Sequence, residues 1–176
     1  VGVEITAGEH DILLFSSAGK SIRFKESDVR SVGRTAIGVR GIRLADKDKV
    51  VSLIVAESDD PILTATEKGY GKRTQLDEYR AQARGGSGVI SIKTSDRNGQ
   101  VVGAIQVTDE DEMMLISDKG TLVRARAADV SIIGRNTQGV TLINIADDEA
   151  LVSVAKIAET DDDEESAEDV NETSEE

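Results

Sequence analysis

The sequence repeats itself about every 50 residues, and this repeat limits the folds open to the chain more than any other feature. Three segments align along their whole length: "DILLFSSAGKSIRF" from Asp11, "PILTATEKGYGKRT" from Pro61 and "EMMLISDKGTLVRA" from Glu112. A repeat of this length is one supersecondary unit, which buries its apolar face by stacking on its neighbours. The sequence therefore predicts an array of similar units.

Each unit has the pattern of β-structure. Apolar residues alternate or run for four to seven positions, and Gly, Asp, Asn and Ser separate the runs. Every unit offers four such runs, the third being 38–44, 88–94 and 139–145 in the three units. Four strands at a period near 50 predict an all-β fold, a propeller-like β-pinwheel array of about four-stranded blades.

The repeat divides the chain into five parts. Blades are expected at 11–60, 61–111 and 112–158, and an acidic tail at 159–176. Residues 1–10 are expected to hold a linker and the last strand of a preceding blade, because "VGVEIT" at the start aligns with "VGAIQV" from Val102. The array is thus expected to begin before the first residue.

The charge is distributed unevenly between body and tail. The chain has 34 acidic and 21 basic residues, and 11 of the acidic residues but no basic residue lie in 159–176. Without this segment the net charge is −2 in place of −13. A like-charged run with so few apolar residues cannot offset the entropy of ordering, so the tail is expected to be disordered.

The basic residues gather in the front part of each unit. Residues 11–44 hold seven, 62–94 hold six and 112–145 hold four, which is 17 of the 21, against three acidic residues in each segment. In an array around an axis, this pattern predicts a positive stripe along one edge, the electrostatic footprint of a nucleic-acid-binding protein. Only 2% of the residues are aromatic, which favours contact with the backbone of duplex DNA over base stacking on single strands.

Ten basic residues are candidates for phosphate contacts. Several recur at the same phase of the repeat, namely the arginines at 23, 73 and 124 and those at 34, 84 and 135. The candidates are Lys20, Arg23, Arg34, Arg40, Lys72, Arg73, Arg84, Lys119, Arg124 and Arg135.

No set of residues suggests catalysis, metal binding or a cofactor in this chain. The single histidine, His10, precedes a strand and is expected at the surface. The glycines near Gly85 lack the Gly-Lys-Ser/Thr that a nucleotide-binding loop requires. Two other classes remain open: a propeller for protein–protein interaction, and an enzyme with a site at the propeller axis. The first would not need arginine in phase on every blade, and no acid, base or metal ligands converge to support the second.

The segments "ILLFSSAGKSIRFKESDVRSVGRTAIGVRGIRL", "ILTATEKGYGKRT" and "SIIGRNTQGVTLI" closely resemble the C-terminal domain of the bacterial DNA gyrase A subunit, and the resemblance covers roughly residues 1–158. It implies a six-bladed β-pinwheel that wraps duplex DNA around a positive rim, of which this chain supplies the last three blades. The related domain of topoisomerase IV is the alternative.

The resemblance also implies partners. The chain would work with the remainder of the gyrase A subunit, together with the gyrase B subunit, in an A2B2 heterotetramer. This assembly is a type II topoisomerase that introduces negative supercoils at the expense of ATP, in the bacterial cytoplasm at the nucleoid. The DNA-cleaving tyrosine and the site for ATP and Mg²⁺ would lie outside this chain, which would be inert alone.

The family's signature box reads Gln-Arg-Arg-Gly-Gly-Lys-Gly and lies in the first of the six blades. The stretch "QARGGSG" at 82–88 occupies the equivalent place in the second repeat here. It keeps Gln82, Arg84, Gly85, Gly86 and Gly88, but has Ala and Ser where the box has basic residues. We interpret it as a degenerate copy, in which the glycines shape the loop and Arg84 is left as a candidate phosphate contact.

Overall fold

The computed structural model describes residues 2–157 of the 176 residues. The predicted acidic tail, 159–176, lies outside the described residues. The elements are β1 (Asp11–Ser16), β2 (Lys20–Lys25), η1 (Glu26–Asp28), β3 (Val50–Ala56), β4 (Ile62–Thr66), β5 (Tyr70–Thr74), η2 (Leu76–Glu78), β6 (Val89–Ile90), β7 (Val101–Gln106), β8 (Glu112–Ser117), β9 (Leu122–Arg126), η3 (Ala127–Asp129), β10 (Val140–Thr141) and β11 (Leu151–Lys156). Between residues 2 and 157, no helix has the length and apolar character to cross a membrane.

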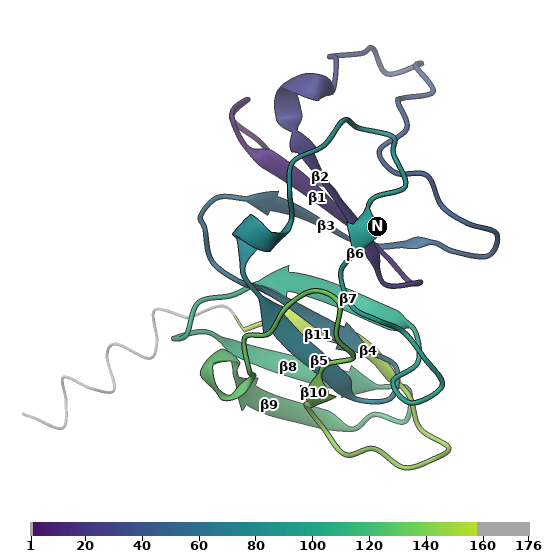
Figure 1. Ribbon diagram of the computed structural model, residues 1–176, viewed down its shortest axis with the longest axis vertical. Helices are drawn as coiled ribbons and strands as arrows, with labels where there is room; N and C mark the ends of the chain where they lie inside the picture. The colour runs from purple at the N-terminus through teal and green to yellow at the C-terminus, as the bar shows by residue number, and fades with distance from the viewer. Residues whose placement is uncertain (1, 158–176) are drawn as a thin grey trace, which may run out of the picture.

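The strands form three antiparallel sheets, which we call blades 1, 2 and 3. Their strand orders are β3-β1-β2-β6, β10-β5-β4-β7 and β11-β8-β9. Each blade is built on a tight hairpin, β1–β2, β4–β5 or β8–β9, and the last long strand of the same repeat pairs with the other side of the hairpin. Figure 1 shows blade 1 at the top and blade 3 at the bottom. The all-β, three-repeat fold is confirmed.

The outer strand of each complete blade comes from the following repeat. β6 belongs to the second repeat but pairs with β2 of the first, joining Lys20 to Ile90 and Ser21 to Val89. β10 of the third repeat pairs in the same way with β5 of the second. The third run of a repeat therefore completes the blade before it, an exchange that the blade boundaries expected at 11–60 and 61–111 do not include.

The third run of the first repeat forms no strand. Residues 38–44, the counterpart of β6 and β10, have no strand pairing in the structure. The expected strand at residues 1–6 is likewise absent over 2–6, where Val3 and Ile5 are almost fully exposed. Both segments have the apolar pattern of strands, but neither pairs with a described strand, and a strand needs a partner for its backbone hydrogen bonds.

The inner strands of the blades pack together along one line. β7 packs between β3 and β11, and the backbone N–H of Ala104 in β7 donates to Oγ of Ser52 in β3 at 2.9 Å. Two apolar cores fill the spaces between the blades. Leu13, Phe15 and Tyr79 belong to the core between blades 1 and 2, and Leu63, Met113 and Leu115 to the core between blades 2 and 3. The outer strands and their loops therefore lie on the side away from this axis.

Candidate nucleic-acid interface

The stretch 82–88, which we call the box loop, lies against blade 1. Its backbone is tied to the loop that precedes β3, since Gly85 N–H donates to the carbonyl of Gly41 at 2.6 Å and Arg43 N–H donates to that of Gly86 at 2.8 Å. Gly88 has φ of 69°, and a Cβ there would overlap the carbonyl oxygen of Ser21. Glycine is needed at this position because β6 approaches β2 so closely.

Four exposed basic side chains surround this junction, and we call them the loop cations. Lys20 lies opposite Ile90 at the pairing of β2 with β6, Arg40 and Arg43 lie on the loop tied to the box loop, and Lys93 follows β6. Gly85 lies beside the Arg40 carbonyl, and Gly88 lies beside Ser21, the neighbour of Lys20. Gly85 and Gly88 are three residues apart, and three residues span at most about 10 Å, so the backbones of Arg40 and Lys20 are close to each other.

The loop cations are not neutralised by the described part of the protein. None of Lys20, Arg40, Arg43 and Lys93 has a carboxylate of another described residue within the 4.0 Å of a salt bridge. Several other cations are paired, among them Lys119 with Asp148 and Lys156 with Asp111. Exposed, unpaired cations around a glycine loop are suited to bind phosphate groups.

Arg23 and Arg73, which were predicted as phosphate contacts, instead join one repeat to the next. Nε of Arg23 donates to Asp11 at 2.7 Å, and its Nη1 to the carbonyl of Leu76 at 2.9 Å. Nε of Arg73 donates to the carbonyl of Val130 at 2.9 Å, and its Nη1 pairs with Asp109.

The exposure of the arginines at this phase depends on whether they contact a following repeat. The side chains of Arg23 and Arg73 are 18% and 5% exposed, whereas that of Arg124, at the same phase, is 62% exposed and pairs with Glu112 on its own hairpin. The prediction is wrong for Arg73, which is buried and already hydrogen-bonded, and Arg23 is largely occupied by the protein.

Lys72 is a second correction. It is fully buried, and its Nζ donates to the carbonyls of Gly134 and Arg135 at 2.6 Å each. Burial lowers its pKa to about 8, a shift that Glu78 opposes and Arg135 reinforces. The first repeat has Ile22 and the third has Val123 at this position, so the lysine replaces an apolar core residue and cannot reach DNA.

The arginines at the box position also hold the repeats together. Nε of Arg84 donates to the carbonyl of Asp28 at 3.2 Å, and its Nη1 to that of Arg40. Nη1 of Arg135 donates to the carbonyl of Ile90 at 2.8 Å, and Glu78 lies 3.9 Å from its Nε. Gln82 is partly buried, and no described residue bonds its side-chain nitrogen. Arg34, at the same phase as these arginines, is exposed.

Two of the loop cations were missed by sequence reasoning, namely Arg43 and Lys93. They occupy the same phase of the repeat, each directly after a buried isoleucine, Ile42 or Ile92. Their backbones also make equivalent contacts, because Lys93 N–H donates to the carbonyl of Thr137 as Arg43 N–H does to that of Gly86. The short patterns "GIRL" and "SIKT" contain this signal, since a cation following a buried residue in a strand-like run faces solvent.

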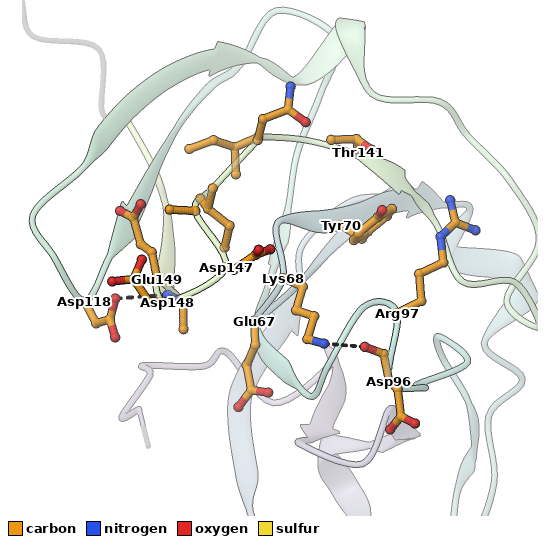
Figure 2. Close-up of a pocket in the computed structure, with 15 residues that line it drawn as sticks. Glu67, Lys68, Tyr70, Asp96, Arg97, Asp118, Thr141, Asp147, Asp148 and Glu149 are labelled. Carbon is orange, nitrogen blue, oxygen red and sulfur yellow. Dashed lines mark hydrogen bonds between the residues drawn. The ribbon is translucent and has the colours of Figure 1, made fainter.

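A pocket between blades 2 and 3 has the opposite charge (Figure 2). Asp118, Asp147, Asp148 and Glu149 gather on one side of it, and Asp96 lies with Lys68 and Arg97 on the other. The Arg97 guanidinium lies 4.9 Å from the centre of the Tyr70 ring. The acidic residues are Glu67, Asp96, Asp118, Asp147, Asp148 and Glu149. So many carboxylates would repel phosphate, so this pocket does not belong to a DNA-binding surface.

Comparison with known proteins places the chain in a family. The family described as "DNA gyrase C-terminal domain, beta-propeller" matches residues 10–57, 60–108 and 111–158, one match for each repeat. The DNA gyrase A subunit of Klebsiella oxytoca is 59% identical over 165 residues, which cover 94% of this chain and 19% of that protein. The chain thus spans about a fifth of the length of this relative.

Two solved structures share the fold. A DNA gyrase A C-terminal domain superposes with a TM-score of 0.81 at 30% identity, covering 87% of this chain and 52% of the other. The C-terminal domain of a DNA topoisomerase IV gives 0.85 at 26% identity, covering 99% and 55%. The likeness to topoisomerase IV is thus one of fold at lower identity, and the long sequence matches are to gyrase. The three repeats, their shared strands and these matches show that the chain belongs to the family of DNA gyrase C-terminal β-propeller domains.

Proposed function

We propose that this chain binds double-stranded DNA through the loop cations and helps to wrap it around the outer side of the blades. The observation that carries the proposal is the group of exposed, unpaired cations around the box loop: Lys20, Arg40, Arg43 and Lys93. Backbone contacts of this kind hold a duplex without reading its sequence. The family and the fold support the same function.

The physical basis of the proposal is the release of counterions. Each cation that neutralises a phosphate frees an ion condensed on the DNA, which favours binding at low salt. Bending a site of 20–30 base pairs costs on the order of 1–6 kcal/mol, and additional phosphate contacts along the curve offset this cost. Cations recurring at the junctions between repeats would make such contacts along the path of the DNA.

The proposal extends to the larger enzyme. Within the gyrase A subunit, the chain would present wrapped DNA to the remaining domains of that polypeptide and to the gyrase B subunit, so that strand passage introduces negative supercoils. DNA cleavage, and the ATP and Mg²⁺ that drive the cycle, would belong to the other parts of this assembly. The chain would contribute binding and curvature, and it would act in the bacterial cytoplasm at the nucleoid.

The test is binding of a labelled duplex of about 40 base pairs over a series of salt concentrations. Four phosphate contacts predict a slope of about −3.6 in a plot of log affinity against log salt, so affinity should fall on the order of 10²-fold between 50 and 200 mM. The double variant Arg40→Glu, Arg43→Glu should bind at least about tenfold more weakly and should reduce the slope by about 2.

The matched control is the double variant Arg126→Glu, Lys156→Glu. It changes the net charge by the same amount, but both residues are paired with carboxylates, Asp129 and Asp111, and neither is a candidate phosphate contact. Equal losses of affinity in the two variants would mean that DNA binding depends only on the net charge of the protein. An unchanged affinity in the Arg40, Arg43 variant would contradict the proposed site. Reversing Arg73 is not a usable test, because that side chain is buried in the junction between repeats.

A further inference from the structure

The arginine at the box position makes the same contact at both junctions between repeats in this chain. Nη1 of Arg84 donates to the carbonyl of Arg40 in the preceding repeat. Nη1 of Arg135 donates at 2.8 Å to the carbonyl of Ile90, which occupies the position of Arg40 one repeat later. Because it recurs with the same atoms, this contact belongs to the design of the repeat.

The guanidinium group of Arg84 is directed at the protein. Its Nε donates at 3.2 Å to the carbonyl of Asp28, the last residue of the 3₁₀ helix η1, while its Nη1 holds the carbonyl of Arg40. Arg135 lies equally close to Glu78, the counterpart of Asp28, and its backbone N–H donates to that carboxylate at 3.3 Å. Arg84 is partly buried and Arg40 is exposed. Arg84 thus binds two carbonyls of the preceding repeat, and Arg40 is the cation that faces solvent.

The box loop holds the backbone that carries Arg40 and Arg43. Three consecutive residues of this loop, 84–86, make hydrogen bonds with residues 40, 41 and 43 of the preceding repeat. Ile42, between the two cations, is buried. The exposed side chains of Arg40 and Arg43 therefore project from a backbone whose position is set by the following repeat.

The second junction has the same arrangement around Lys93. Lys93 N–H donates to the carbonyl of Thr137 at 2.8 Å, and Arg135 holds the carbonyl of Ile90, three residues before Lys93. Ile90 also lies opposite Lys20 in the pairing of β6 with β2. At both junctions, the arginine at the box position is therefore bound to backbone next to loop cations.

We propose that Arg84 is a positioning residue for DNA binding: it fixes the backbone from which Arg40 and Arg43 project, and it touches no phosphate itself. The inference rests on the proposed function, because it leaves the phosphate contacts to the loop cations. Cations that are already held at a fixed spacing lose less conformational entropy when a duplex binds, which raises affinity without a new contact. The degenerate box thus acts on DNA through the cations of the preceding repeat.

The first test places Arg84→Gln in the native chain and in the double variant Arg40→Ala, Arg43→Ala, with duplex binding measured over the same salt series. A positioning residue is energetically coupled to the residues that it holds, so Arg84→Gln should weaken binding by about threefold or more in the native chain. Once both cations are removed, it should change neither the affinity nor the salt slope. A direct phosphate contact would instead reduce the slope by about 1 in both backgrounds, and that result would overturn the inference.

The conservative variant Arg84→Lys separates the geometry of the guanidinium group from its charge. Lysine binds phosphate as a point charge, but its compact ammonium group does not reproduce two hydrogen bonds directed at separate carbonyls. We expect Arg84→Lys to bind DNA as weakly as Arg84→Gln does, and native affinity in the lysine variant would overturn the inference. Arg126→Gln is the control for charge, since Arg126 is paired with Asp129; an equal loss of affinity there would overturn it as well.

The second test is hydrogen exchange in the absence of DNA. In Arg84→Gln, the amides of Gly85 and Arg43, which join the box loop to the preceding repeat, should exchange faster. The amides that pair β1 with β2 report on overall folding and should exchange as in the native chain. Native exchange rates at both Gly85 and Arg43 would show that Arg84 does not hold this backbone.

The two proposals fail in different ways. If Arg40→Ala, Arg43→Ala alone binds the duplex as tightly as the native chain does, the proposed function fails, and the positioning role of Arg84 fails with it. If this double variant loses affinity while Arg84→Gln keeps it, only the positioning role fails.

Discussion

At the residue scale, the basic residues that recur once per repeat show that periodicity can have two causes. Arg23 and Arg73 recur because every junction between repeats needs a donor for the carbonyls of the next 3₁₀ helix, and both are engaged in the protein. Arg43 and Lys93 recur because the residue after a buried isoleucine points to solvent. Periodicity alone cannot separate these cases, because a residue that joins two repeats and a residue exposed to solvent both recur once per repeat.

Lys72 gives a prediction about pH. Its pKa is about 8 in the folded protein against an ordinary value of 10.5, so between these pH values the unfolded chain binds more protons at this residue than the folded chain does. The contribution of Lys72 to the free energy of unfolding therefore rises with pH, by up to about 3 kcal/mol over this range. Urea unfolding of the protein and of Lys72→Met, at a series of pH values from about 7 to 10.5, measures it.

The methionine variant is compared with the protein at each pH, because the other titrating groups are common to both chains. We expect the difference in unfolding free energy to move in favour of the native chain as the pH rises from about 8. Parallel pH dependences in the two chains would show that the buried ammonium group is not destabilised relative to the unfolded state, and would contradict the prediction.

At the scale of the elements, the hairpins could be predicted from the sequence and the exchange of strands could not. The pattern around Gly19, Gly69 and Gly120 indicates a turn between two apolar runs, and the structure has a hairpin at each. The run at 88–94 also indicates a strand, but the pattern does not show which other strand it pairs with. That choice depends on which edge is left open once the hairpins have formed, a property of the assembled array.

The box loop gives a prediction about the pairing of β6. We expect Gly88→Ala to lower the free energy of unfolding by at least about 2 kcal/mol, because a methyl group there would overlap the Ser21 carbonyl at a residue whose φ is 69°. Hydrogen exchange should show faster exchange of the amides that join β2 to β6.

The control is Gly8→Ala. Gly8 also has a positive φ, 102°, but no atom lies within 4 Å of the position of its Cβ, so only the cost of the backbone conformation applies, about 1 kcal/mol. An equal loss in the two variants would show that the close approach of β6 to β2 contributes nothing to stability.

At the scale of the whole molecule, the distribution of charge along the chain matters more for DNA binding than the net charge. The net charge of −13 would suggest a protein that avoids DNA, yet 11 of the 34 acidic residues lie in the last 18 positions. In the described residues, carboxylates gather in the pocket between blades 2 and 3, and unpaired cations gather around the box loop. The sequence indicated a positive region, but which cations are unpaired depends on contacts between distant parts of the chain.

The tail leads to a prediction about competition. Tethered carboxylates act at a high effective concentration on nearby cations, so removal of residues 159–176 should tighten binding of a labelled duplex, most at low salt, where screening is weakest. The control replaces the same residues by a neutral Gly/Ser segment of equal length. If this neutral tail leaves DNA affinity as weak as the native one does, the charge of the tail is not the cause.

The exchange of strands between repeats also sets the order in which the protein can fold during its synthesis. β6 is synthesised roughly 65 residues after β2 has ended, which at the usual elongation rates takes about 3–13 s. For that time the β2 edge of blade 1 stays open, also after β3 has joined the sheet, and blade 2 then waits in the same way for β10. Each blade is therefore completed only when the following repeat has been translated. Slow translation in the middle of the chain prolongs the time for which the open edge can pair with a neighbouring nascent chain.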